Sequence, residues 1–279
     1  MTGLILFYQK EDSVRLQCEI DINKLFSTSK ERERFENKWN NFLESDHYNK
    51  KLFELKGNIL KYQSEQLIPR KVNETSPLLL ILGNPASHSI KEGMFFSFEK
   101  DKKEHRFWRD ILTKSGVLEL SFDSNLPVTE LNERRKNQLL NLDYNSPFRI
   151  GLCVFISMPS KASGPWSGIA GVQKLIGAKA MKKLEKEESK RIIECAQKFL
   201  EPKGVAVAFQ KNAWNALRSD KAPEYTLDKA KNGKLKGRLK EMPNIPLFGV
   251  PPTRLSAPCS GILRQLLKEQ GYSLKYNKS

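Results

Sequence analysis

The chain has 279 residues, of which 39% are hydrophobic, and its 48 Lys and Arg residues outnumber its 32 Asp and Glu residues to give a formal net charge of +16. No apolar run approaches the roughly 18 residues of a membrane helix, and the first residues lack the basic lead and long apolar core of a signal peptide. We therefore expect neither a membrane protein nor a secreted one. The excess positive charge favours a polyanionic partner such as nucleic acid.

The four cysteines are spread along the chain and form no Cys-x-x-Cys pair. This spacing predicts free thiols in a reducing compartment and argues against a zinc or iron–sulfur site. We expect no metal and no organic cofactor. The expected location is the cytoplasm, with association to the nucleoid if the source is bacterial.

The first 60 residues are interpreted as a largely helical N-terminal extension. Polar and apolar residues alternate over 14–22, which is compatible with a short strand. A helix is predicted over 29–44, and 46–62 are interpreted as a shorter helix followed by a loop. The helix over 29–44 places three aromatic residues on one face, at the spacing of core packing: Phe35, Trp39 and Phe42.

Buried strands alternate with helices in the remainder of the chain, and residues 160–180 are expected to form a loop. Strands are predicted at 77–83, 149–156, 205–209 and 245–250. Helices are predicted to begin at Arg106 and to cover 181–200, 212–217 and 261–270. Strands that alternate with helices imply a parallel sheet covered on both faces. Residues 61–279 are thus predicted to form a three-layer α/β/α sandwich around a mostly parallel four-stranded sheet.

Two of the predicted strands end in polar loops. Asn84 follows the first strand and precedes Pro85, which disfavours helical backbone at Asn84 and holds it extended. Residues 252–256 follow the last strand. Ligands of open α/β sheets bind at such carboxyl ends, although an Asn-Pro pair is by itself also typical of a simple turn.

Taken together, several short segments resemble the uracil-DNA glycosylase superfamily, and most closely its mismatch-specific uracil/thymine branch. They occur in the family's order: Gly83-Asn84-Pro85, Gly93-Met94-Phe95-Phe96, Arg106-Phe107-Trp108, Met158-Pro159-Ser160, Phe209-Gln210-Lys211-Asn212-Ala213-Trp214 and Pro251-Pro252-Thr253-Arg254-Leu255-Ser256. The resemblance covers about residues 77–271. It implies a monomeric, monofunctional enzyme of DNA repair that rotates a damaged or mismatched base out of DNA and hydrolyses its bond to deoxyribose.

The resemblance also assigns roles to individual residues. Asn84 would position the attacking water, and the base pocket would be formed by Gly83, Pro85, Phe96 and Cys153, with Phe96 stacking on the base. Leu255 would fill the space that the base vacates. Further contacts to DNA are expected from Ser87, Ser89, Thr253, Arg254 and Ser256.

Some departures from the family pattern keep a second hypothesis open. Pro251 stands where the efficient uracil enzymes have His, and Val154 lies near the position of a base-reading Asn. His88 and His105 are the candidates to replace the missing His. The alternative is therefore a catalytically impaired DNA-binding protein of the same fold. An unrelated α/β hydrolase or phosphate-ligand enzyme is disfavoured, since its Gly-rich and nucleophile motifs are absent.

The most basic stretch, 229–240, carries six positive charges and no negative one. It is interpreted either as a solvated loop or as a flexible arm that binds phosphates.

Overall fold

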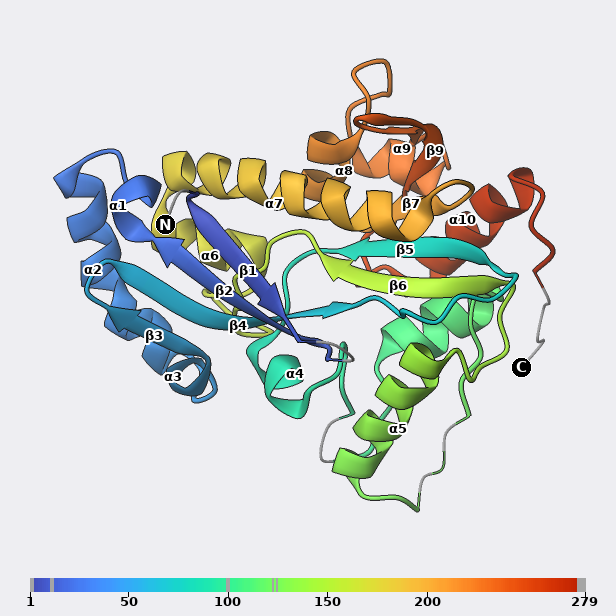
Figure 1. The fold of residues 1–279 in the computed structure, drawn as a ribbon, viewed down its shortest axis with the longest axis horizontal. Coiled ribbons are helices and arrows are strands. Elements are labelled where there is room, and N and C mark those ends of the chain that lie inside the picture. Colours follow the sequence, from blue (N-terminus) through green and yellow to red (C-terminus); the bar gives the residue numbers. More distant parts are fainter. Residues whose placement is uncertain (1–2, 11–12, 99–100, 122, 124, 275–279) are drawn as a thin grey trace. The chain divides into compact units, whose positions relative to one another are not determined.

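The structure is a computed structural model that describes residues 3–10, 13–98, 101–121, 123 and 125–274. Its described residues form an α/β protein with nine strands in parallel and antiparallel pairs (Figure 1). Contacts divide the chain into two compact units, each assembled from separate segments. Unit 1 contains Met1–Gln66, Gly83–Phe95 and Val154–Arg191, and unit 2 contains Leu67–Leu82, Phe96–Cys153 and Ile192–Ser279.

Unit 1 is built on antiparallel strands. β2 (Arg15–Asp21) pairs with β1 (Ile5–Gln9) and with β4 (Ile59–Leu67), and β4 also pairs with β3 (Phe53–Lys56). The expectation of a largely helical extension is therefore wrong for much of this segment. Its strands obey the two-residue period: alternate side chains of β2 are buried while those between them face outward.

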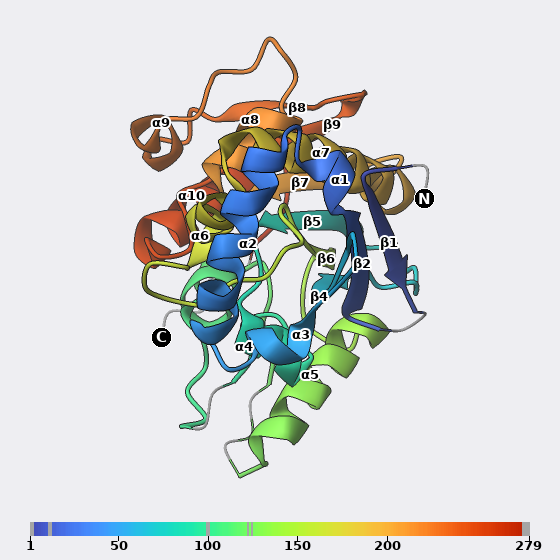
Figure 2. The same cartoon turned by 90° about the vertical axis from the view of Figure 1, so that its left-hand side faces the viewer.

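The helices of unit 1 follow the apolar spacing of their sequences. They are α1 (Ile22–Leu25), α2 (Ser29–Glu44), α3 (Asn49–Leu52), α4 (Ser87–Glu92), α6 (Gly168–Ile176) and the first part of α7 (Ala178–Leu200). The prediction for α2 is confirmed, because Phe35, Trp39 and Phe42 are all buried. The loop expected over 160–180 is wrong in part, since it contains α6, which lies against α2 (Figure 2).

Unit 2 contains the four predicted buried strands together with β8, which was not predicted, so the expected four-stranded sheet is not confirmed. The strand order is β6 (Phe148–Val154), β5 (Ser76–Leu82), β7 (Val205–Ala208), β9 (Met242–Gly249) and β8 (Lys236–Leu239). β5, β7 and β9 are parallel neighbours, whereas β8 is antiparallel to β9. β6 and β7, the next two strands along the chain after β5, lie on opposite sides of β5 in the sheet. The direction in which the chain adds strands therefore reverses between β5 and β7. Open α/β sheets bind ligands at such a reversal.

The connections of unit 2 are largely helical. They comprise the π-helix η1 (Phe107–Thr113), α5 (Val128–Asn141), α8 (Lys211–Leu217), α9 (Leu227–Lys231) and α10 (Ser256–Glu269). η1 packs against α10. The basic stretch 229–240 is not simply a loop, because it includes the end of α9 and all of β8.

One buried carboxyl group in unit 1 is expected to make the stability of the protein depend on pH. Glu65 on β4 is 4% exposed, and its Oε2 has no hydrogen-bond partner among the described residues. Burial raises its pKa well above the usual value. The folded state then retains a proton that the unfolded chain loses, so this residue lowers stability as pH rises from about 4.5 toward the folded pKa.

Replacing Glu65 with glutamine is therefore expected to raise the free energy of unfolding at pH 7.5 by about 1–3 kcal/mol, with a smaller gain at pH 4.5. Urea unfolding at the two pH values measures the effect. Glu54→Gln, at an exposed position on β3, is the control and should change stability little at either pH. An equal effect of Glu65→Gln at both pH values would contradict the prediction.

Candidate functional site

The segments that follow β5 and β6 run side by side within unit 1. The amide of Ile156 donates to the carbonyl of Gly83 at 3.0 Å, and that of Ser160 donates to Pro85 at 3.1 Å. Ser87 N–H in turn donates to the carbonyl of Ser160 at 3.0 Å. These bonds continue strand-like pairing beyond the ends of both strands. The residues before and after Asn84 are therefore both hydrogen-bonded to the segment that follows β6.

The side-chain amide of Asn84 is fixed by this neighbouring segment. Its Nδ2 donates to the carbonyl of Met158 at 3.2 Å and to Oγ of Ser160 at 2.9 Å. A carbonyl can only accept, so the NH₂ group must face it, and this assigns the orientation of the amide. Oδ1 lies on the side of Gly168, where an added Cβ would be 4.0 Å away. The half-buried Asn84 thus retains an acceptor that no described residue occupies.

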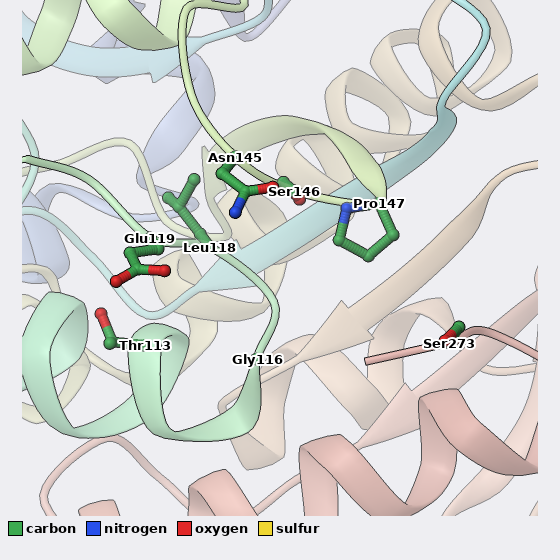
Figure 3. Close-up of a pocket in the computed structure, with 8 residues that line it drawn as sticks. All are labelled: Thr113, Gly116, Leu118, Glu119, Asn145, Ser146, Pro147 and Ser273. Atoms are coloured by element: carbon green, nitrogen blue, oxygen red, sulfur yellow. The ribbon is translucent and has the colours of Figure 1, made fainter. Parts of the chain in front are cut away.

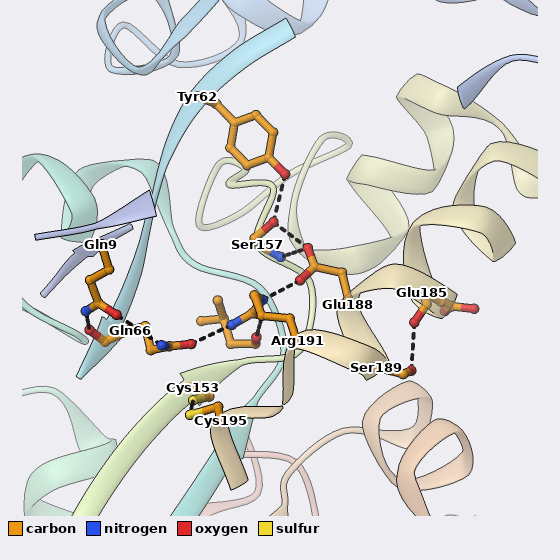
Figure 4. A network of polar contacts seen from close by, with 11 residues as sticks. Gln9, Tyr62, Gln66, Cys153, Ser157, Glu185, Glu188, Ser189, Arg191 and Cys195 are labelled. Atoms are coloured by element: carbon orange, nitrogen blue, oxygen red, sulfur yellow. Dashed lines mark hydrogen bonds and ion pairs between the residues drawn. The ribbon is translucent and has the colours of Figure 1, made fainter. Parts of the chain in front are cut away.

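A buried polar network holds the segment that supports Asn84 (Figure 4). Ser157 donates to the carboxylate of Glu188 on α7 through its backbone N–H, at 2.6 Å, and through its hydroxyl. Arg191 donates to the same carboxylate at 2.8 Å. Tyr62 OH lies 2.7 Å from the Ser157 hydroxyl, and burial raises the pKa of Tyr62 well above its usual value. The start of the β6 exit segment is therefore anchored to α7 and β4.

The guanidinium of Arg191 completes this network. It also donates to Oε1 of Gln66 at 2.7 Å and to the carbonyl of Val154. Glu188 is 0% exposed and Arg191 7%. With its hydrogen bonds satisfied, such a buried ion pair is stable as a unit, although loss of either partner would leave an uncompensated charge.

The two serines of α4 that were predicted to contact DNA are buried. The Ser87 hydroxyl donates to Oδ1 of Asn49 at 2.6 Å. The Ser89 hydroxyl lies 3.3 Å from Nε2 of His88. Both hydroxyls are used inside unit 1 in this conformation, so we assign them no contact to DNA.

Phe96, the predicted stacking residue, belongs to unit 2 and has a strained backbone. Its φ is +45°, a left-handed value that bulky residues rarely adopt. Its ring stacks on His105 with centroids 4.6 Å apart and lies 4.4 Å from that of Phe107. The carbonyl of Phe96 accepts a bond from Nε1 of Trp108 at 3.0 Å. Backbone strain of this kind is concentrated at functional sites, and here it is held by the start of η1.

The loop that leaves β9 carries the other predicted DNA contacts. Leu255 N–H donates to the carbonyl of Pro252 at 2.8 Å and closes a turn, and Ser256 is the first residue of α10. Arg254 is exposed, whereas Thr253 and Leu255 are half-buried. This loop therefore presents one charged and one large apolar side chain ahead of a helix N-terminus.

A polar cavity of about 320 Å³ lies next to this loop in unit 2. Arg106 connects the two features, since its Nη1 donates to the carbonyl of Arg254 at 3.5 Å. The cavity is lined by Ser97, Asp101, Lys103, Glu104, His105, Arg106, Arg109, Asp110 and Ser256. Sequence reasoning missed it. The mixed charges around His105 were the available signal, but their convergence on Ser256 requires the packing of η1 against α10.

Cys153 does not line this cavity. It is fully buried on β6, and its Sγ lies 3.5 Å from that of Cys195 on α7 (Figure 4). A second cavity of about 320 Å³ in unit 2, shown in Figure 3, contains none of the predicted site residues; Glu119 and Asn145 are among those that line it.

Over the described ranges, no group of His, Cys, Asp and Glu side chains is arranged to hold a metal ion. No helix there is long and apolar enough to cross a membrane. A comparison with the models of known protein families finds no match, and a comparison with curated proteins finds no significant match either.

Proposed function

We propose that this protein binds DNA and hydrolyses the N-glycosidic bond of a damaged or mismatched base of the uracil/thymine class. The observation that carries the proposal is the orientation of the Asn84 amide. Its NH₂ group is engaged by Met158 and Ser160, which leaves Oδ1 as a fixed acceptor for a water molecule. A neutral acceptor that orients water is sufficient when the bond to the leaving group is already breaking.

In the proposed reaction the bond between C1′ and the base nitrogen breaks with its electrons going to the base. Positive charge develops on the sugar, as in other glycosidic cleavages. The water held by Asn84 forms the new bond to C1′, and its proton passes to solvent or to the departing base. Preorganisation of the amide removes the need to orient the water during the reaction.

Two features of unit 2 support recognition of DNA. Phe96 offers a ring whose position is fixed by His105 and Phe107, and such a ring can stack on a base of any kind. Leu255 is suited to fill a vacated base stack, because apolar side chains act as wedges in the minor groove. The net charge of +16 attracts the phosphate backbone.

The direct test is excision from a panel of duplexes that contain uracil, thymine opposite guanine, or deaminated purines. Purified protein is incubated with each duplex in excess, and alkali then cleaves any abasic site. Strand breakage on at least one substrate is the expected result. Absence of breakage on every substrate at high protein concentration would reject the enzymatic function.

Leu255→Ala is expected to lower kcat/KM for excision about tenfold, since losing an apolar contact of this size costs about 1–3 kcal/mol. Leu227→Ala on α9 is the control, because it makes the same truncation in unit 2 at a leucine outside this loop, with a side chain that is 39% exposed. It should leave kcat/KM unchanged. Equal effects of both variants would argue against a wedge.

One observation favours the alternative of a DNA-binding protein without excision activity. Pro251 is buried after β9 and has neither an N–H group nor a side-chain donor. It cannot stabilise negative charge on a departing base, as a histidine could. This alternative predicts salt-sensitive binding of DNA that Asn84→Ala leaves unchanged, together with no strand breakage in the panel.

A further inference from the structure

The polar cavity beside α10 is lined by a buried hydroxyl that lacks a hydrogen-bond partner within the described part of the chain. Ser97 is 2% exposed and lines the cavity, and its Oγ has no hydrogen-bond partner among the described residues. Most buried hydroxyls in folded proteins are paired, so an exception calls for an explanation such as an absent ligand. A ligand oxygen in the cavity would supply the missing acceptor.

The N-terminus of α10 opens into the same cavity. Ser256 is both the first residue of this 14-residue helix and part of the lining. The residue before it, Leu255, has no side chain that can cap the helix, so the first backbone N–H groups are not satisfied in that way. Free N–H groups and the helix dipole together favour an anion at this point.

Two of the three acidic side chains of the lining are paired with cations. Glu104 binds the buried guanidinium of Arg135. Asp110 pairs with Arg109 at 2.7 Å and with Lys114 at 3.1 Å.

Asp101, the remaining acidic residue of the lining, accepts a bond from the backbone N–H of Lys103 at 2.9 Å. The positive charges of Lys103 and Arg106 are left without a partner carboxylate among the described residues. The cavity therefore combines a buried hydroxyl donor, a helix N-terminus and two cations that lack a carboxylate partner with one carboxylate, that of Asp101, that lacks a cation partner.

We propose that this cavity binds a phosphate group of the DNA backbone. Tetrahedral phosphate oxygens accept bonds from hydroxyls, backbone N–H groups and guanidinium groups together, which is the donor set present here. DNA is the source we favour, because Arg106 also binds the carbonyl of Arg254 and so ties the cavity to the exposed loop after β9. The inference rests on the proposed DNA binding but does not require excision.

The test uses an undamaged, fluorescently labelled duplex, and affinity is measured by anisotropy over a range of salt concentrations. Loss of one phosphate contact is expected to reduce the slope of log affinity against log salt by about 0.9. Arg106→Met should show this reduction and bind about tenfold more weakly at low salt. Arg134→Met removes the same charge from an exposed position on α5, and it should retain the slope of the unaltered protein.

Ser97→Ala separates binding from folding. A hydroxyl that is unsatisfied in the free protein contributes nothing to stability, so this variant should unfold at the same urea concentration as the unaltered protein or a higher one. It should nevertheless bind DNA about 5–10 times more weakly. Unchanged affinity in both Ser97→Ala and Arg106→Met would overturn the proposal, as would a Ser97→Ala variant that loses stability but not affinity.

Two further arms identify the source of the phosphate. Inorganic phosphate at constant ionic strength should compete with DNA in the unaltered protein and not in Ser97→Ala. Duplexes with and without 5′-phosphate ends should bind equally, whereas a preference for phosphorylated ends would overturn the assignment to backbone phosphate. None of these measurements requires base excision. Failure of the substrate panel would therefore reject the excision activity without deciding whether the cavity binds phosphate.

Discussion

Asn84→Ala is expected to lower the rate of base excision by about 100-fold or more while leaving the affinity for DNA unchanged. The variant removes the acceptor that orients water, and misplacing a reacting group by even an ångström costs on the order of 100-fold. Single-turnover excision measures the rate on whichever substrate the panel identifies. Anisotropy on the same duplex measures affinity.

Ser160→Ala provides a graded comparison. It removes the Ser160 hydroxyl, which accepts from Nδ2 of Asn84 at 2.9 Å. The bond from Nδ2 to the carbonyl of Met158, at 3.2 Å, remains. We expect a loss of rate of about tenfold, between those of the unaltered protein and Asn84→Ala. A normal rate in Asn84→Ala would remove Asn84 from the mechanism, and a normal rate in Ser160→Ala would show that Met158 alone is sufficient.

Glu188→Ala is expected to lower the free energy of unfolding by about 3–5 kcal/mol, the range seen when one partner of a buried ion pair is removed. The substitution leaves the Arg191 guanidinium without its charge partner at 7% exposure. It also leaves the Ser157 N–H without its acceptor. Urea unfolding, monitored by circular dichroism, measures the change in the free energy of unfolding.

The neighbouring pair on α7 supplies the control. Glu187 and Lys190 have the same i,i+3 spacing as Glu188 and Arg191, but their side chains are 24% and 57% exposed. Glu187→Ala should therefore cost no more than about 1 kcal/mol. A loss for Glu188→Ala as small as the loss for Glu187→Ala would contradict the prediction.

Glu188→Gln connects this network to function. The amide can still accept from Ser157 but has no charge to offer Arg191, so we expect an intermediate loss of stability of about 1–3 kcal/mol. Because Ser157 begins the segment that carries Met158 and Ser160, the variant should also slow excision. Retention of the full excision rate would indicate that the Asn84 amide is held without help from the network.

Periodicity in the sequence was sufficient to locate elements that bury a regular apolar face. The aromatic residues of α2 follow the helical period, and β5, β6, β7 and β9 each contain a short run that is mostly apolar. Such patterns reflect burial directly and do not depend on which other segment covers them. The parallel arrangement of β5, β7 and β9 followed from their alternation with helices.

β4 was missed because polar residues occupy buried positions in it. Ser64 and Glu65 are 0% and 4% exposed, and a serine next to a glutamate reads locally as a solvated segment. α6 was missed for a different reason. The glycine-rich sequence around it indicates a loop, whereas contact with α2 stabilises a helix.

The sequence by itself determined the charge of the protein, its buried strands and the stiff Asn84-Pro85 exit, because each depends on residues that are neighbours in the chain. Only the tertiary structure decided what those residues contact. Asn84 is oriented by Ser160, 76 positions away, and the charge on Glu188 is compensated in a network that also includes Tyr62 and Ser157. The cavity between Ser97 and Ser256 likewise arises from packing, since hydrogen bonds and burial are set by distance in space, which local sequence does not specify.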